Sequence, residues 1–145
     1  MAKQYDLLVI GAGPGGYTAA LKAAEFGMRV AVIERKTIGG TCVNRGCIPT
    51  KALLYASDMF HMMQNSDEFG VFTDFISFDF AKMQKYKDQA VAKYRESIAA
   101  AFERKNVEIV YGKGILRRDR TVEVELAAGG KEFYQGTHVI IATGA

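Results

Sequence analysis

The fold is decided by one stretch near the start of the chain, Leu7-Leu8-Val9-Ile10-Gly11-Ala12-Gly13-Pro14-Gly15-Gly16. Its four apolar residues predict a short buried strand, and the glycines predict a tight turn into a helix over residues 17–26. A second apolar run follows at residues 30–33 and ends in Glu34. This order of strand, Gly-rich turn, helix, strand and acidic residue is typical of a dinucleotide-binding unit.

Each part of this unit has a physical reason. Gly11 allows the tight turn, Gly13 lets the backbone approach a pyrophosphate, and Gly16 lets the helix pack closely on the strand. Glu34 is placed to accept hydrogen bonds from a ribose diol, and the helix N-terminus favours an anion. A Gly-x-Gly-x-x-Gly alone also fits an ordinary glycine-rich loop, but the acid at the expected spacing favours a dinucleotide. The unit does not choose between FAD and NAD.

Working outward, residues 39–51 contain both cysteines of the chain, Cys42 and Cys47. In a regular helix two Cα atoms at this spacing lie ~8.7 Å apart, whereas a disulfide tolerates at most about 6.8 Å. A bonded pair therefore requires a bend between them, and Asn44 and Gly46 tolerate turn and left-handed dihedrals. Since Pro49 suits a first helical turn, we expect Cys42 before a helix and Cys47 at its start.

A cysteine at a helix start should be reactive, because the unpaired N–H groups and the helix dipole favour the thiolate. Lys51, one turn beyond Cys47, adds positive charge. The alternatives are two ordinary thiols, a structural disulfide, or half of a zinc site. So short a loop stabilises a fold by only roughly 2 kcal/mol. We therefore interpret the pair as a redox-active disulfide and expect no metal.

Composition sets the broad class of the protein. The 145 residues suit one domain, with 49% hydrophobic and 24% charged residues. A net charge of +3, from 19 basic and 16 acidic side chains, gives no argument for nucleic acid or membrane partners. No targeting segment is evident at the N-terminus, so we expect a cytoplasmic protein, in which a disulfide is more often catalytic than structural.

Beyond residue 51 the pattern predicts two helical segments and then strands. Residues 58–70, with Met59, Met62 and Met63, and the amphipathic residues 79–105 are expected to contact the core. For residues 79–105 the alternative is a helix interface with a partner subunit. Residues 107–111 predict a strand, residues 121–126 and 131–135 a hairpin, and residues 138–142 a buried strand. The chain ends directly after that strand, so we expect a piece of a longer protein whose uncovered strand edges and apolar faces favour self-association.

Three motifs together resemble the FAD-dependent pyridine nucleotide-disulfide oxidoreductases: the Gly-rich turn with Glu34, residues 39–51, and residues 137–144 ending in Ala-Thr-Gly. The resemblance covers the whole chain. It implies an α/β fold: an incomplete Rossmann-like FAD-binding domain with a parallel sheet, helices and a small antiparallel β-meander. Residues 1–145 would be its N-terminal portion, with the NAD-binding and dimer-interface domains outside this chain.

The resemblance also implies roles for individual residues. Cys42 and Cys47 would be catalytic, Cys42 exchanging with substrate and Cys47 facing the flavin. The residues expected to hold FAD are Gly11, Gly13, Pro14, Gly15, Gly16, Glu34, Arg35, Gly40, Thr41, Cys42, Cys47, Lys51, Gly114, Ala142, Thr143 and Gly144.

Residues 48–54 favour the members that oxidise lipoyl groups. The implied reaction is oxidation of protein-bound dihydrolipoamide through the disulfide and FAD, with NAD as acceptor. The implied partners are the lipoyl domains of 2-oxo acid dehydrogenase or glycine cleavage complexes, and the full-length form would be a homodimer. This chain alone is expected to be inactive. The alternatives are another disulfide reductase, such as one for glutathione or mercuric ion, and a non-catalytic dinucleotide-binding module with a redox-sensing cysteine pair.

Overall fold

Five strands and four α-helices make up residues 2–144, the part of the chain that this computed structural model describes. In chain order they are β1 (Lys3–Ile10), α1 (Pro14–Glu25), β2 (Val30–Glu34), α2 (Gly40–Arg45), α3 (Cys47–Gln64), α4 (Phe80–Arg104), β3 (Glu108–Leu116), β4 (Thr121–Leu126) and β5 (Lys131–Ile141). Two 3-10 turns, η1 (Ser66–Phe69) and η2 (Arg118–Arg120), lie in the connections before α4 and before β4.

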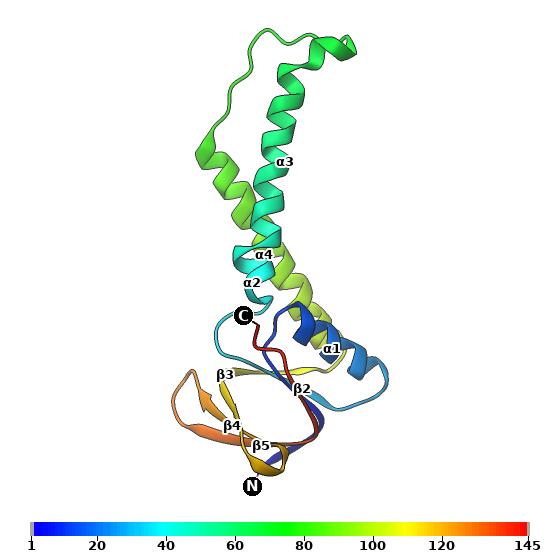
Figure 1. Ribbon diagram of the computed structural model, residues 1–145, viewed down its shortest axis with the longest axis vertical. Helices are drawn as coiled ribbons and strands as arrows, with labels where there is room; N and C mark the ends of the chain where they lie inside the picture. Colours follow the sequence, from blue (N-terminus) through cyan, green and yellow to red (C-terminus); the bar gives the residue numbers. More distant parts are fainter. Residues whose placement is uncertain (1, 145) are drawn as a thin grey trace.

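The strands form a closed sheet in the order β1-β2-β3-β4-β5 (Figure 1). β1 lies parallel to both β2 and β5, β2 lies parallel to β3, and β4 lies antiparallel to β3 and β5. The parallel sheet and the predicted hairpin are therefore present. Each of these strands pairs on both sides, so the expectation of uncovered strand edges is wrong for the described residues.

Strands β1, β3 and β5 are longer than the sequence pattern predicted. β1 begins at Lys3, four residues before the predicted apolar run. β3 continues through Gly112 and Gly114 to Leu116, and the segments predicted as residues 131–135 and 138–142 form the single strand β5. Glycine within a strand allows a close approach of neighbouring groups. At Gly136 a Cβ would lie 3.0 Å from the Leu8 Cγ, and at Gly112 it would lie 2.5 Å from the Glu125 carbonyl oxygen. Because these glycines allow close approach, β3 and β5 can each pair in parallel with one neighbouring strand and antiparallel with β4.

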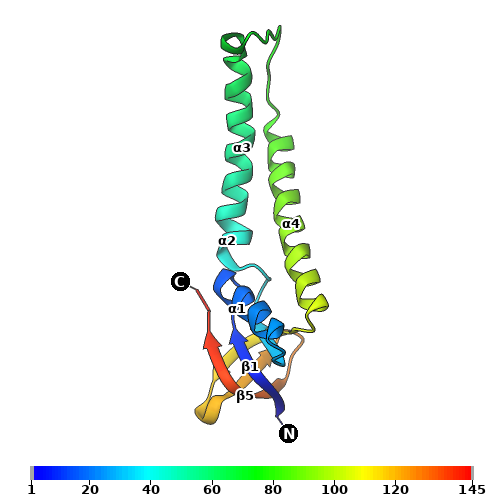
Figure 2. The same ribbon diagram turned by 90° about the vertical axis from the view of Figure 1, so that its right-hand side faces the viewer.

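The closed sheet separates two apolar cores. Side chains alternate between the faces of a strand, so Leu8 and Ile33 pack inside the closed sheet while Val9 and Val32 pack outside it. The outer core is completed by Ala20 of α1 and Phe102 of α4. The predicted helix over residues 17–26 is confirmed as α1, which covers this outer face (Figure 2).

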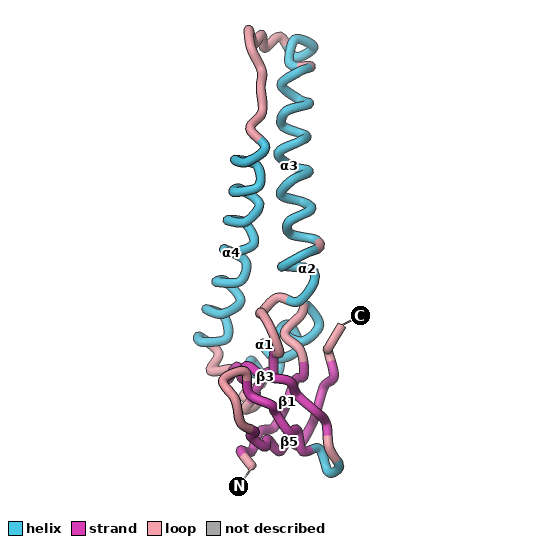
Figure 3. The backbone as a smooth tube through the Cα atoms, turned by 90° about the vertical axis from the view of Figure 1, so that its left-hand side faces the viewer, coloured by secondary structure: helices cyan, strands magenta, loops and turns pink. Residues whose placement is uncertain are grey.

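Helices α3 and α4 form a long hairpin that projects away from the sheet, and an extended segment joins their far ends (Figure 3). Only the base of α4 reaches the core, so Ile98 and Phe102 are buried. Farther out, Met59, Met62 and Met63 on α3 are exposed, as are Phe80 and Tyr86 on α4. The helical prediction is confirmed for residues 58–64 in α3 and residues 80–104 in α4, but residues 66–69 form the 3-10 turn η1. The expected core contact is wrong for the outer turns of both helices. No helix in residues 2–144 is long and apolar enough to cross a membrane.

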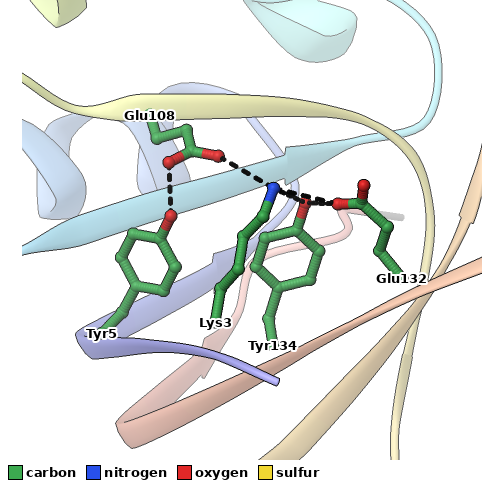
Figure 4. Close-up of polar contacts among 5 residues, drawn as sticks. All are labelled: Lys3, Tyr5, Glu108, Glu132 and Tyr134. Atoms are coloured by element: carbon green, nitrogen blue, oxygen red, sulfur yellow. Dashed lines mark hydrogen bonds and ion pairs between the residues drawn. The ribbon is translucent and has the colours of Figure 1, made fainter. Parts of the chain in front are cut away.

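A polar cluster occupies the N-terminal edge of the parallel strands (Figure 4). The hydroxyl of Tyr5 donates to Glu108, and the hydroxyl of Tyr134 donates to Glu132. The Lys3 ammonium lies 3.1 Å from Glu132 and 3.9 Å from Glu108. Burial and the hydrogen bond to Glu108 raise the pKa of Tyr5 to about 12. The hydrogen bonds from Tyr134 and Lys3 lower the pKa of Glu132.

Candidate functional site

A cavity of about 780 Å³ lies at the opposite edge of the sheet, where β1, β2 and β5 end. This is the edge at which ligands bind in open parallel sheets. Its walls come from Gly11, Gly13, Pro14, Gly15, Glu34, Arg35, Lys36, Thr37, Gly40, Thr41, Cys42, Asn44, Arg45, Gly46, Cys47, Arg95, Ala142, Thr143 and Gly144. The size falls within the range of roughly 300–1,000 Å³ that small-molecule sites occupy.

All but three of the predicted site residues line this cavity. Gly16 lies in the first turn of α1, Lys51 is exposed on α3, and Gly114 lies on β3, where a Cβ would meet Ile33 and Ile10 inside the closed sheet. The sequence interpretation missed six residues of the wall as cavity residues: Lys36, Thr37, Asn44, Arg45, Gly46 and Arg95. Two of these six residues could have been predicted, because each directly adjoins a predicted site residue: Lys36 follows Arg35, and Gly46 precedes Cys47.

The first wall of the cavity is the glycine-rich turn. Gly11 has a φ of 105°, a left-handed conformation that an L side chain rarely adopts, and its N–H donates to the Ile33 carbonyl. At Gly16 a Cβ would overlap the Gly11 carbonyl oxygen and lie 3.3 Å from the Val9 side chain. The expected reason for Gly16, close packing of helix on strand, is therefore confirmed.

Helix α1 begins at this turn with its N-terminus open. Gly13 is the N-cap and Pro14 follows it, and no side chain caps the helix. The first N–H groups of a helix have no partner within the helix. Together with the helix dipole they form a region that favours an anion beside Gly13 and Gly15.

Glu34, at the end of β2, is buried with 8% of its surface exposed. One carboxylate oxygen accepts from the Ala12 N–H and the other from the Lys36 N–H, each at 2.8 Å. These bonds fix the carboxylate against the glycine-rich turn. Since each oxygen has a further lone pair, Glu34 retains the capacity to accept from a ligand hydroxyl in the cavity.

A second glycine turn packs directly on the first. Gly39 and Gly40 have φ values of 100° and 59°, and the Gly39 N–H donates to the Ala12 carbonyl at 2.8 Å. A Cβ at Gly40 would lie only 2.7 Å from the Gly13 Cα. The two motifs that the sequence separates by more than twenty residues are therefore one continuous wall.

Cys42 and Cys47 form a disulfide with their Cα atoms 4.7 Å apart. Cys47 is the first residue of α3 and Cys42 precedes that helix, as expected, but Cys42 lies in a short helix of its own, α2, which the sequence analysis did not predict. The bend is made at Gly46, with φ −125° and ψ −106°, while Asn44 is helical. Neither Asn44 nor Gly46 adopts the left-handed conformation that their residue types tolerate.

The disulfide opens onto the cavity. Both cysteines line it, with Cys47 exposed and Cys42 half-buried. No side chain caps the N-terminus of α3, so its free N–H groups favour a thiolate on Cys47. The described residues hold no group of three or more His, Cys, Asp or Glu side chains that could bind a metal ion.

The charge of the cavity is predominantly positive. Arg35, Lys36, Arg45 and Arg95 line it against the single carboxylate of Glu34. With the open N-terminus of α1, these cations make a site suited to a ligand that carries phosphate groups.

Comparison with known proteins identifies a family over almost the whole chain. Residues 5–145 match the family model for pyridine nucleotide-disulphide oxidoreductases. A dihydrolipoyl dehydrogenase of Chlorobaculum parvum is 39% identical over 98% of this chain and 30% of that protein. One of Bacillus subtilis is 39% identical over 97% of this chain and 30% of that protein.

A leghemoglobin reductase of Vigna unguiculata is similar to the same degree, 42% identical over 97% of this chain and 27% of that protein. The chain therefore spans about a third of the length of the curated relatives it matches. Relatives with two different names match this region equally well.

Proposed function

The chain belongs to the pyridine nucleotide-disulphide oxidoreductase family, and from that premise we propose that it supplies the FAD-binding and disulfide portion of a dihydrolipoyl dehydrogenase-like enzyme. One observation carries the proposal: the Cys42–Cys47 disulfide opens onto the same cavity as the glycine-rich turn and the N-terminus of α1. This arrangement supports a redox-active pair beside a dinucleotide site.

The residues of the cavity fit FAD. The glycines at positions 13 and 40 leave the backbone bare where a Cβ would fill the space between the two turns. The α1 N-terminus and the surrounding cations would hold the pyrophosphate, and Glu34 would accept from the adenosine ribose. Thr41, Cys42 and Cys47 would lie on the flavin side, and residues 142–144 would pack on the other side of the cofactor.

The cysteines carry the exchange with substrate. A substrate thiolate attacks Cys42 Sγ, the bond to Cys47 breaks, and Cys47 leaves as a thiolate that the α3 N-terminus stabilises. The second substrate thiol then attacks its own mixed disulfide and releases Cys42. The substrate dithiol has lost two electrons and two protons, and the cysteine pair holds the electrons. Bound FAD supplies the route by which those electrons leave for NAD.

The substrate class and the partners rest on the relatives. Several proteins that match 97% or more of the chain are named dihydrolipoyl dehydrogenase, which supports dihydrolipoamide as the dithiol. Its carriers would be the lipoyl domains of 2-oxo acid dehydrogenase or glycine cleavage complexes. The intact protein would be a homodimer, with an NAD-binding and an interface domain following residues 1–145.

The test is a visible absorption spectrum of the intact gene product, before and after reduction by one equivalent of dihydrolipoamide. We expect a flavin spectrum that gains a long-wavelength thiolate-to-flavin band. The matched variants are Cys42→Ser, which should show that band without substrate because Cys47 is then a free thiolate, and Cys47→Ser, which should lack it under all conditions.

Other outcomes would overturn the proposal. A bound flavin with no new band on reduction would leave a dinucleotide-binding module with a redox-sensing cysteine pair. Turnover with glutathione but not with dihydrolipoamide would retain the disulfide chemistry and replace the substrate.

A further inference from the structure

Asn44 lies between the two cysteines, and its side chain ties α2 to the turn that precedes it. The Asn44 Nδ2 donates to the Ile38 carbonyl at 3.0 Å and to the Gly40 carbonyl at 2.7 Å. The same turn is fixed to the glycine-rich turn through the Gly39 N–H and the Ala12 carbonyl. Asn44 therefore links the helix that carries Cys42 to the rigid wall of the cavity.

The remaining polar atom of Asn44 is bonded to a different helix. Arg95, on α4, donates from its Nε to the Asn44 Oδ1 at 2.5 Å, across 51 positions of sequence. Both side chains line the cavity. The Asn44 amide thus uses both of its N–H donors and its oxygen to join three segments: the turn, α2 and α4.

We propose that Asn44 and Arg95 form a clamp that positions Cys42 against Cys47 after the disulfide has been reduced. The inference rests on the proposed function and deepens it. Asn44 and Arg95 act through the placement of Cys42, so they are positioning residues.

The clamp acts differently on the two redox states. In the oxidised state the covalent bond itself holds α2 at the start of α3, with Cα atoms 4.7 Å apart. In the reduced state that bond is absent, and α2 is held by the burial of Val43 and by the hydrogen bonds of Asn44 and Gly39. Removing the clamp frees mainly the dithiol, which gains conformational entropy. The disulfide then becomes easier to reduce.

The experiment measures the redox equilibrium of the two cysteines in the intact gene product. In buffers of reduced and oxidised dithiothreitol, one dithiothreitol gives two electrons and two protons to the disulfide and becomes the cyclic disulfide. Acid quenching and maleimide labelling, followed by mass spectrometry of the peptide that contains Cys42 and Cys47, then count the reduced fraction.

We expect Asn44→Ala to be half-reduced at an about tenfold lower ratio of reduced to oxidised dithiothreitol, because it loses three hydrogen bonds. For this two-electron couple a tenfold change is about 30 mV, towards a less negative potential. Arg95→Met should shift the ratio about threefold. Arg95→Gln, which has an amide donor without the charge, should restore the ratio to within about twofold of wild type.

Lys93→Ala is the matched control, since Lys93 is an exposed cation on the same helix as Arg95. It should leave the ratio unchanged. Unshifted ratios in Asn44→Ala and Arg95→Met would overturn the clamp, even if both variants unfold at lower temperature. Equal shifts in Arg95→Met and Arg95→Gln would overturn it too, because charge and not the hydrogen bond would then be responsible.

The exposed Arg95 keeps the test decisive if Asn44→Ala does not fold, because surface substitutions seldom prevent folding. The proposed function is tested separately by the flavin spectrum. A wild-type protein with the thiolate-to-flavin band and variants without a shift would contradict the clamp alone. Shifted variants in a protein without that band would contradict the proposed function and leave the clamp standing.

Discussion

The two edges of the parallel sheet are built in opposite ways. At the C-terminal edge the chain turns through glycines, which have no side chain to fill the space between the turns, and a cavity of about 780 Å³ remains. At the N-terminal edge Tyr5 and Tyr134 fill the space inside the closed sheet, with ring centroids 6.1 Å apart. Their hydroxyls meet the carboxylates and the lysine of the polar cluster in Figure 4.

The difference separates stability from function within one sheet. Buried aromatic rings contribute large apolar surfaces to a core, so the closed edge should carry much of the fold's stability. Glycine turns and uncapped helix N-termini can bind ligands, but they contribute few side chains to the packing of the core. Substitutions at the two edges should therefore destabilise the protein for different reasons. At the open edge an added side chain has no space, whereas at the closed edge a removed side chain leaves a cavity.

Tyr134→Ala should have the largest effect. The side chain is 1% exposed, and truncating a buried aromatic side chain costs about 3–5 kcal/mol of unfolding free energy. Tyr134→Phe should cost only about 1 kcal/mol, since it removes the hydrogen bond and retains the ring. Urea unfolding followed by circular dichroism measures both. Phe133→Ala, at a neighbouring residue that is 48% exposed, is the control and should have a small effect.

Gly16→Ala should be next, at the open edge. A Cβ there would overlap the Gly11 carbonyl oxygen, and overpacking of this kind costs about 1–3 kcal/mol. The adjacent Gly15 has no heavy atom within 4 Å of a Cβ position, so Gly15→Ala should leave the unfolding free energy within about 1 kcal/mol of wild type. Equal losses in the two variants would contradict the assigned packing.

Reducing the disulfide should have a still smaller effect on stability. The bond joins residues separated by 5 positions, and closing so short a loop contributes about 2 kcal/mol at most in the chain-entropy model. Urea unfolding with and without dithiothreitol measures the loss. A loss of 4 kcal/mol or more would make the pair a structural bond and weaken the case for a redox role.

The sequence predicted the elements of this sheet well, because each depends on local patterns. The run before Gly11 and the run before Glu34 became β1 and β2, and the Gly-rich turn started α1. The closure of the sheet was missed because it depends on β3 and β5 each pairing with two different neighbours. Exposure of Met59 was missed because periodicity identifies the apolar face of a helix but not whether anything covers it.

The site was predicted to the extent that it follows strand ends and glycine turns. Asn44 was interpreted as a turn residue. In the structure its role comes instead from its side chain, which is hydrogen-bonded to Ile38, Gly40 and Arg95. Arg95 could not be predicted, since it reaches the cavity only because α4 returns beside α2. No local pattern around residue 95 distinguishes it from the other cations of an amphipathic helix.

The smallest effect is invisible at neutral pH and appears only in alkali. Burial raises the pKa of Tyr5 to about 12 in the folded protein, whereas the unfolded phenol titrates near 10. Between these values the unfolded chain binds fewer protons than the folded one, so stability should fall as pH rises from about 10 to 12. With partial solvent screening we expect a contribution on the order of 1 kcal/mol.

Tyr5→Phe should reduce the slope of the urea midpoint against pH, and Tyr111→Phe, at an exposed residue of β3, should not. An unchanged slope in Tyr5→Phe would mean that the closed edge admits hydroxide without unfolding, and the contrast between the two edges would be weaker than their packing implies.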